Sequence, residues 1–222
     1  MDDVKLNLKK DKNMSFELVH KITSQAENIS KEVYIVCKDI LEDKRFRVWS
    51  ASSNSNQHHY GQGGLIQHTS EVIDICLKIK ELYAKKYEID TIELFLSAFF
   101  HDIGKMWDYI PKRPENILDH DYEHIINARY MDYPYDEWES THHKRLIHHI
   151  SRSGLVWSEN AKKSQIIYKD YHDKVLHAIL SHHTKREYGS PVAPKSRIAW
   201  MLTLCDNLSA RMYDADSWDI LG

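Results

Sequence analysis

The sequence predicts an all-α protein, and three observations support this prediction. The 222 residues include only 7 Gly and 5 Pro, and long stretches of the chain contain neither. Apolar residues recur at helical spacing within these stretches. Hydrophobic residues make up 42% and charged residues 28%, an ordinary globular balance, and the length suits one large domain or one domain with an appendage. With no repeat or low-complexity linker, we expect a helical appendage over residues 1–55 and one domain over residues 56–222.

The first third of the chain is expected to be helical with one polar loop. Residues 1–14 are polar and predict a frayed or disordered lead-in. In residues 15–43 the apolar positions fall near helical spacing and fit one broken helix or two. Residues 44–62 are rich in Ser, Asn, Gln and Gly and predict a loop, and residues 65–82 predict a long helix.

The next apolar run, LFLSAFF, predicts a buried helix that ends in an imidazole and a carboxylate. Asp90 and Thr91 precede it as N-caps. His101 and Asp102 follow it directly, and Gly104 indicates that the helix ends or kinks there. Burying a carboxylate in apolar surroundings is costly unless a cation or strong hydrogen bonds compensate it. A metal ion would supply that compensation.

The second half of the chain is expected to contain short elements and then core helices. Residues 108–145 are polar, aromatic and interrupted by proline, and predict short helices or loops that form a lid over the site. Residues 146–156, 173–185 and 198–212 predict helices, and the segment SPVAPKS predicts a loop before the last of them.

Charge, cysteine content and hydropathy limit the classes of function. The net charge of −3 shows no global basic signature, so nucleic-acid binding would need a local patch. The three separated cysteines form no CxxC motif, and a reducing cytoplasm is the natural compartment. The polar N-terminus has no apolar signal core, and no apolar run is long enough to span a membrane.

The chain contains 15 histidines, and several of them lie on apolar helices or at their ends. Histidine is the commonest metal ligand and the side chain best suited to proton transfer near neutral pH. Four adjacent pairs occur: His58-His59, His142-His143, His148-His149 and His182-His183. The candidate ligands are His68, His101, Asp102, His149, His182, His183 and Asp206. Each alone fits a core, capping or surface residue, but together each would need its own buried partner, which favours a shared metal site.

Phosphate-ester hydrolysis would use such a set of ligands. A divalent transition metal lowers the pKa of bound water and acts as a Lewis acid. Imidazole suits Mn, Fe, Ni, Co or Zn, and a carboxylate can bridge two ions. We expect one site from His68, His101, Asp102 and Asp206, and a second from Asp102 with His149, His182 and His183. Lys105 is expected to reach a phosphate oxygen, and a solvated lysine beyond a helix end is the alternative.

Five sequence blocks surround these residues in order: HHYGQGGLIQHTSEV, FFHDIGK, LIHHI, ILSHHTKREYGSPVAPKS and CDNLSARM. His68, His101-Asp102 and Asp206 in this arrangement resemble the HD-domain metal-dependent phosphohydrolase superfamily. The blocks cover most of residues 56–212 and are most similar to its YhaM-type 3′→5′ exoribonuclease branch.

The resemblance implies a helical bundle with the metal site between its core helices. It implies that Lys105 contacts phosphate and, by similarity to dinuclear members, that His149, His182 and His183 surround a second metal. The motif LIHHI does not show whether His148 or His149 is the metal ligand, and His149 is preferred. The OB-fold of the YhaM-type nucleases and the GYP motif are missing, and Thr184 stands where a glycine often follows the histidine pair.

The leading functional hypothesis is a phosphodiesterase that acts on nucleic-acid 3′ ends or oligonucleotides through a metal-activated hydroxide. Asp102 and Lys105 would be catalytic, with one or two divalent ions as cofactor. Arg186, Lys195 and Arg211 would bind outer phosphates. The alternatives are a nucleotidase or nucleoside triphosphate hydrolase and, ranked last, a nucleotide-sensing module. The expected partner is a nucleotide or single-stranded nucleic acid, with no membrane, and an oligomer is left open.

Overall fold

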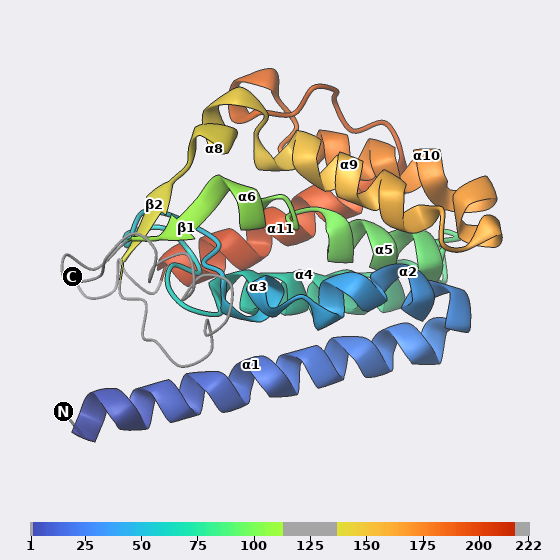
Figure 1. Cartoon of the computed structure of the whole chain (residues 1–222). Helices are drawn as coiled ribbons and strands as arrows, with labels where there is room; N and C mark the ends of the chain where they lie inside the picture. The colour runs from blue at the N-terminus through green and yellow to red at the C-terminus, as the bar shows by residue number, and fades with distance from the viewer. Residues whose placement is uncertain (1, 113–136, 216–222) are drawn as a thin grey trace.

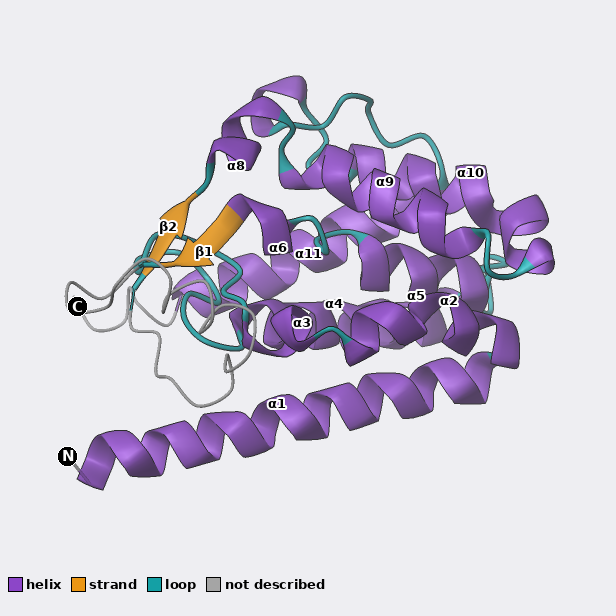
Figure 2. Cartoon of the chain, in the orientation of Figure 1, coloured by secondary structure: helices purple, strands orange, loops and turns teal. Residues whose placement is uncertain are grey.

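The computed structural model describes residues 2–112 and 137–215, and only the backbone of residues 2–13 and 213–215. Helices dominate it, which confirms the all-α prediction (Figure 2). The helices are α1 (Asp2–Ile29), α2 (Lys31–Glu42), α3 (Lys44–Val48), α4 (Gly64–Tyr83), α5 (Thr91–Phe100), α6 (Lys105–Asp108), α8 (His142–Leu146), α9 (His149–Ala161), α10 (Gln165–Ser181) and α11 (Arg197–Ala215). A 3₁₀ turn spans Arg186–Tyr188. None of the described helices is long and apolar enough to cross a membrane.

Helix α5 forms the centre of the bundle. Its N-terminus is fixed by Asp90, whose side chain accepts hydrogen bonds from the backbone N–H groups of Ile92 and Glu93. Every residue from Leu94 to Phe100 is buried, and helices α4, α9, α10 and α11 pack around it (Figure 1). The residues that follow α5 therefore lie in the middle of the bundle, between these helices.

Helices α1 and α2 pack against this bundle. Ile22 and Ala26 of α1 and Val33 and Val36 of α2 are fully buried in the same hydrophobic core as α5. Helix α1 runs beneath the bundle, and its N-terminal part extends past it (Figure 1). The division into an appendage over residues 1–55 and a domain over residues 56–222 stays a prediction.

Several element boundaries differ from the sequence prediction. The lead-in predicted over residues 1–14 is wrong for residues 2–14, which belong to α1 because no proline or glycine interrupts that stretch. The predicted loop over residues 44–62 begins with α3, because Asp43 caps the backbone N–H of Arg45 at 2.8 Å. Helix α10 starts well before the predicted residue 173, because Ser164 supplies an N-cap.

Residues 108–145 contain a short hairpin that the sequence analysis did not predict. Strands β1 (Tyr109–Pro111) and β2 (Trp138–Ser140) pair antiparallel, with Tyr109 opposite Ser140. Trp49 joins the hairpin to the loop before α4, because its indole N–H donates to the Tyr109 carbonyl at 2.6 Å. The predicted lid falls largely on residues 113–136, which lie outside the described residues.

Candidate metal centre

Four buried ligand-type side chains from three helical segments meet at the inner end of α5. His68 comes from the first turns of α4, His101 and Asp102 follow α5, and Asp206 comes from α11. The His68 Nε2 atom lies 3.1 Å from Asp206 Oδ1, 3.3 Å from Asp102 Oδ2 and 3.2 Å from His101 Nε2. One ligand atom from each side chain lies within 4.8 Å of the others. Two imidazoles and two carboxylates at this spacing suit a divalent transition metal.

The outer nitrogens of these imidazoles are held by acceptors in the protein. His101 Nδ1 donates to the Ala98 carbonyl at 2.7 Å. His68 Nδ1 lies 3.2 Å from Ser209 Oγ, which donates to Glu71 Oε2 at 3.0 Å. Such partners fix the ring orientation and leave the Nε2 lone pair for a metal. Both rings therefore present Nε2 to the centre of the cluster.

A second group, His149, His182 and His183, lies on the other side of Asp102. Its ligand atoms lie within 4.8 Å of one another. His149 Nε2 is 3.5 Å and His182 Nε2 3.7 Å from Asp102 Oδ1, and none of these three buried atoms has a hydrogen-bond partner. Buried polar atoms without partners are rare. Three that face one another are what a bound cation would satisfy, so the residues present fit the metal that the sequence predicts.

Gly104 allows α9 to approach this centre. A side chain at Gly104 would overlap the carbonyl oxygen of His149. The Gly104 N–H also donates to Ser153 Oγ of α9 at 2.8 Å. The glycine that was predicted to end the α5 helix therefore also brings His149 beside Asp102.

Burial and charge set the protonation of the site. Burial alone would lower the pKa of His101, but the adjacent carboxylates of Asp102 and Asp206 raise it to about 10. Burial alone would raise the pKa of Asp102, but Lys105 and His101 hold it well below its usual range. Without a metal, a proton on His101 balances the charge of these carboxylates. A bound metal ion would take the place of that proton on Nε2.

Two imidazoles of the second group, those of His149 and His183, are neutral at pH 7. Burial lowers the pKa of His149 to about 4 and that of His183 to about 3. Metal ligation requires the neutral form of histidine. Both rings can therefore bind a metal at pH 7 without first losing a proton.

Lys105 is part of this centre. Its Nζ lies 2.7 Å from Asp102 Oδ2, and the side chain is 8% exposed. The alternative of a solvated lysine is therefore wrong. Burial would lower the pKa of Lys105, but Asp102 raises it. Lys105 is thus a buried cation beside the carboxylate that the two histidine groups share.

Asp108 is a site residue that the sequence analysis missed. It is fully buried at the end of α6. One carboxylate oxygen accepts from the backbone N–H and from Nδ1 of His149, both at 3.0 Å, and the other lies 2.8 Å from His143 Nδ1. Asp108 therefore orients the His149 ring so that its Nε2 faces Asp102. It lies in a segment without clear periodicity, and nothing in the sequence singled it out.

The pair His58-His59, which received no role from sequence, also lies beside the first group. The His59 ring is buried, with Nε2 2.9 Å from Glu71 Oε2. His58 is centred 5.6 Å from the His68 ring, and burial lowers its pKa to about 3. His59, Glu71 and Ser209 thus form a chain of contacts that supports His68.

Strained backbone surrounds the site. Among the described residues, the non-glycine positions with positive φ are His59 (53°), His148 (68°) and Thr184 (65°), and each adjoins a site residue or supports one. The φ of Thr184 explains why glycine suits the position after the histidine pair. At His148 the strained residue prevents α9 from starting earlier, so the predicted helix over residues 146–156 is displaced to His149–Ala161.

The rings of His148 and His149 occupy different positions relative to the second group. His149 belongs to the second group, and the His148 ring packs on it with centroids 4.1 Å apart. His148 also forms a third possible ligand group with Asp108 and His149, whose ligand atoms likewise lie within 4.8 Å of one another. The geometry is consistent with the preference for His149, whose role as a ligand stays a prediction.

The predicted phosphate-binding residues lie outside the buried centre. Arg186 and Lys195 are exposed and line a pocket of about 590 Å³ together with His177 and Thr184. Arg211 is exposed on α11. Arg186 and Lys195 thus line a surface pocket and are not part of the buried ligand groups, and the role of all three side chains stays a prediction.

Replacing Asp108 with asparagine is expected to weaken metal binding at the second group by about 10–100-fold. The amide keeps the size of the side chain but loses the charge and one of the two acceptor oxygens that hold His149 and His143. Metal titration followed by calorimetry, with elemental analysis, would measure the change. Asp173→Asn is the matched control, because the Asp173 side chain is 98% exposed. An unchanged affinity in Asp108→Asn would contradict the positioning role.

Two comparisons with known proteins agree with this geometry. Residues 65–211 match the family model described as HD domain. The chain is also 25% identical over 176 residues to a dihydroneopterin 2′,3′-cyclic phosphate phosphodiesterase of Methanocaldococcus jannaschii. That alignment covers 78% of this chain and 57% of the relative, so the chain spans little more than half of the relative's length. No solved structure shows significant similarity to the chain.

Proposed function

Since the chain belongs to the HD domain family, we propose that it hydrolyses phosphodiester bonds with bound divalent metal ions. Membership in this family supports an HD-type phosphohydrolase, and the proposal concerns the bond that it cleaves. The observation that carries the proposal is the position of Asp102 between two histidine groups, with its Oδ2 atom beside His68 and its Oδ1 atom beside His149. A carboxylate so placed suits a bridge between two ions.

The residues that would hold the metals are those already predicted as ligands. His68, His101, Asp102 and Asp206 would form the first site, and Asp102, His149, His182 and His183 the second. When bound, the metals would polarise a phosphate oxygen and lower the pKa of a water molecule.

The protein itself contributes a preformed and dry environment. Asp108 and the carbonyls of Ala98 and Ile179 hold the rings of His149, His101 and His182 before any substrate arrives. Such preorganisation avoids the cost of reorganising dipoles during reaction. Lys105 adds a buried positive charge beside Asp102, which favours the negative charge that accumulates on phosphate oxygens in the transition state.

The proposed substrate is the 3′ end of a nucleic acid or a short oligonucleotide. The five sequence blocks resemble the YhaM-type nucleases, and the exposed Arg186 and Lys195 stand near the second histidine group in the chain, where they would bind phosphates beyond the one cleaved. A cyclic phosphodiester is the second candidate, because the relative from Methanocaldococcus jannaschii is named for cleavage of a 2′,3′-cyclic phosphate. Both substrates are phosphodiesters.

The test compares diesters with monoesters on the Mn²⁺-loaded protein. We expect bis-p-nitrophenyl phosphate to be cleaved at least about tenfold faster than p-nitrophenyl phosphate, a difference of ~1.4 kcal/mol in barrier. A labelled RNA should shorten from its 3′ end, and the same RNA ending in a 2′,3′-cyclic phosphate tests the second candidate. Faster cleavage of the monoester or of free nucleotides would instead indicate a nucleotidase. No turnover of any substrate would favour a nucleotide-sensing module.

A further inference from the structure

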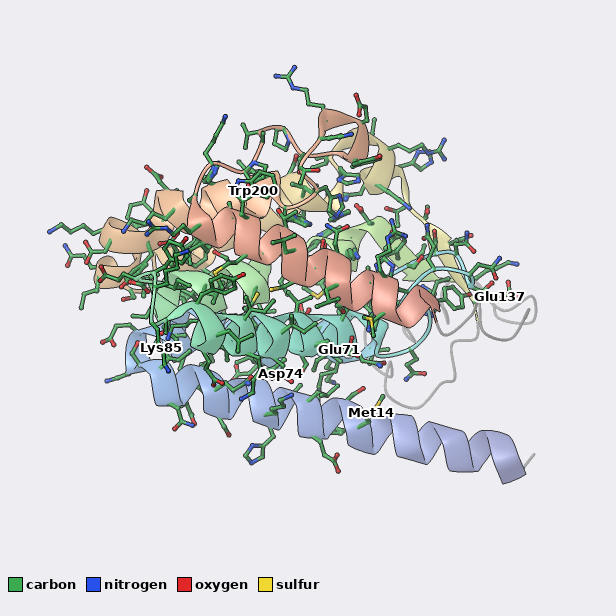
Figure 3. The ribbon with its side chains drawn as sticks, turned by 180° about the vertical axis from the view of Figure 1, so that it is seen from behind. Met14, Glu71, Asp74, Lys85, Glu137 and Trp200 are labelled. Atoms are coloured by element: carbon green, nitrogen blue, oxygen red, sulfur yellow. The ribbon has the colours of Figure 1, made fainter. Side chains whose placement is uncertain are left out.

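A pocket with aromatic walls lies where the start of α11 meets α4. It has a volume of about 440 Å³, and Tyr83, Tyr87 and Trp200 supply its aromatic side chains. Tyr83 is 51% and Trp200 50% exposed. Helices α4 and α11 lie side by side on the face turned to the viewer in Figure 3, where Trp200 is labelled. This pocket, here called the aromatic pocket, therefore offers accessible ring faces to a planar ligand.

The aromatic pocket carries positive charge. Lys195 and Arg197 line it and are exposed, and none of the described side chains that line it is acidic. The Arg197 guanidinium lies over the Tyr87 ring, 5.1 Å from its centroid, which holds a cation against the aromatic wall. Glu88 follows Tyr87 in the chain but does not line the pocket. Aromatic walls edged by cations suit a ligand that combines a flat ring with an anionic group.

Lys195 connects the aromatic pocket to the metal centre. It also lines the pocket of about 590 Å³ that contains Thr184, Arg186 and Ser190, here called the loop pocket. None of the described side chains that line the loop pocket is acidic either. Thr184 directly follows His183 in the chain, and Ser190 Oγ accepts a hydrogen bond from the His183 backbone N–H at 3.0 Å. The loop pocket is therefore built on a residue of the second histidine group, and the aromatic pocket lies beyond it.

We propose that the two pockets form one binding track for single-stranded nucleic acid. A base would stack on Trp200, and the phosphates between that base and the metal centre would contact Lys195 and Arg186. Proteins commonly hold single strands in this way, because every base has a π face and every linkage carries a negative charge. A free phosphate would have no use for the aromatic rings, and an uncharged apolar ligand none for the cations. The inference rests on the proposed function, since the track leads to the centre where the phosphodiester would be cleaved.

Oligonucleotide binding tests the track without turnover. Fluorescence anisotropy would follow a labelled single strand of about 12 nucleotides, with phosphorothioate linkages that resist hydrolysis, on the Mn²⁺-loaded full chain. Trp200→Ala should raise Kd by about 10–100-fold, the effect of losing one stacked base, and Trp200→Phe should recover most of that loss. Leu208→Ala is the matched control, because Leu208 is 44% exposed on α11 and lines neither pocket, and its Kd should equal that of the wild type.

The salt dependence of binding tests the cationic part of the track. Each phosphate that a single strand has neutralised contributes roughly 0.7 to the slope of log Kd against log salt concentration. Lys195→Gln should lower the slope by about this amount, an effect that a purely structural role of the lysine would not produce. Lys169→Gln is the control, because Lys169 is exposed on α10 and lines neither pocket, and it should leave the slope unchanged.

The outcomes separate the track from the proposed function. Equal Kd values for wild type and Trp200→Ala, or a duplex of the same sequence bound as tightly as the single strand, would overturn the track. If wild type cleaves bis-p-nitrophenyl phosphate while Trp200→Ala binds the oligonucleotide normally, the track alone fails. If the variants lose binding as expected while wild type cleaves no diester, the track stands and the proposed function fails.

Discussion

Replacing Asp102 with alanine is expected to remove metal binding and hydrolysis together. The side chain faces both histidine groups, through Oδ2 toward His68 and through Oδ1 toward His149. Its loss takes away the carboxylate group that the two proposed metal sites share. We expect at least about a thousandfold loss of kcat/KM on bis-p-nitrophenyl phosphate, corresponding to ~4 kcal/mol of transition-state stabilisation. Elemental analysis of the same preparation should show the loss of metal.

The interpretation depends on an intact fold, because the substitution also leaves His101 and Lys105 without their shared carboxylate. Asp102→Asn keeps the volume of the side chain and one acceptor for Lys105, and it should lose metal while retaining the helical circular dichroism spectrum. Asp173→Asn controls for the removal of a carboxylate at a site that is 98% exposed. Full turnover by Asp102→Ala or Asp102→Asn would show that the site lies elsewhere.

The parts of the structure that sequence predicts best are those fixed by local interactions. Asp90 caps α5 and an unbroken apolar run follows it, so both the helix and the burial of its end follow from neighbouring residues. The same applies to His101 and Asp102, whose position at the inner end of α5 depends only on that helix. The grouping of His68 and Asp206 with them is predicted from the ligand-type residues on apolar helices taken together, and the resemblance implies the same set.

The parts that sequence missed depend on contacts between distant residues. Asp108 acquires its position because β1, α8 and α9 bring His143 and His149 to it, 35 and 41 residues along the chain. Strands β1 and β2 enclose a long intervening segment, and Trp49 fixes the hairpin from another part of the chain. The strained φ of His148 decides where α9 begins, and the sequence does not indicate which histidine adopts a positive φ. Burial of Lys105 likewise follows from the approach of α9.

Metal loading is expected to raise the thermal stability of the protein substantially. One ion at a concentration of 1,000 times its Kd stabilises the folded state by about 4 kcal/mol, provided that it does not bind the unfolded chain. For a protein of this size each kcal/mol shifts Tm by roughly 2–4 °C, so loading should raise Tm by about 8–16 °C. The physical reason is that the cation would satisfy buried atoms without partners, Asp102 Oδ1, His149 Nε2 and His182 Nε2.

Differential scanning calorimetry of chelator-treated and Mn²⁺-loaded protein measures this shift, and Asp102→Ala separates the site from general effects of the ion. In that variant, Mn²⁺ should move Tm by less than about 2 °C, because less than ~1 kcal/mol of binding free energy would remain. The Tm shift of Asp108→Asn should lie between those of the wild type and Asp102→Ala. This variant retains every proposed ligand but loses the acceptor that orients His149. Equal Tm values for loaded and chelated wild-type protein would show that the two histidine groups are satisfied by protons alone.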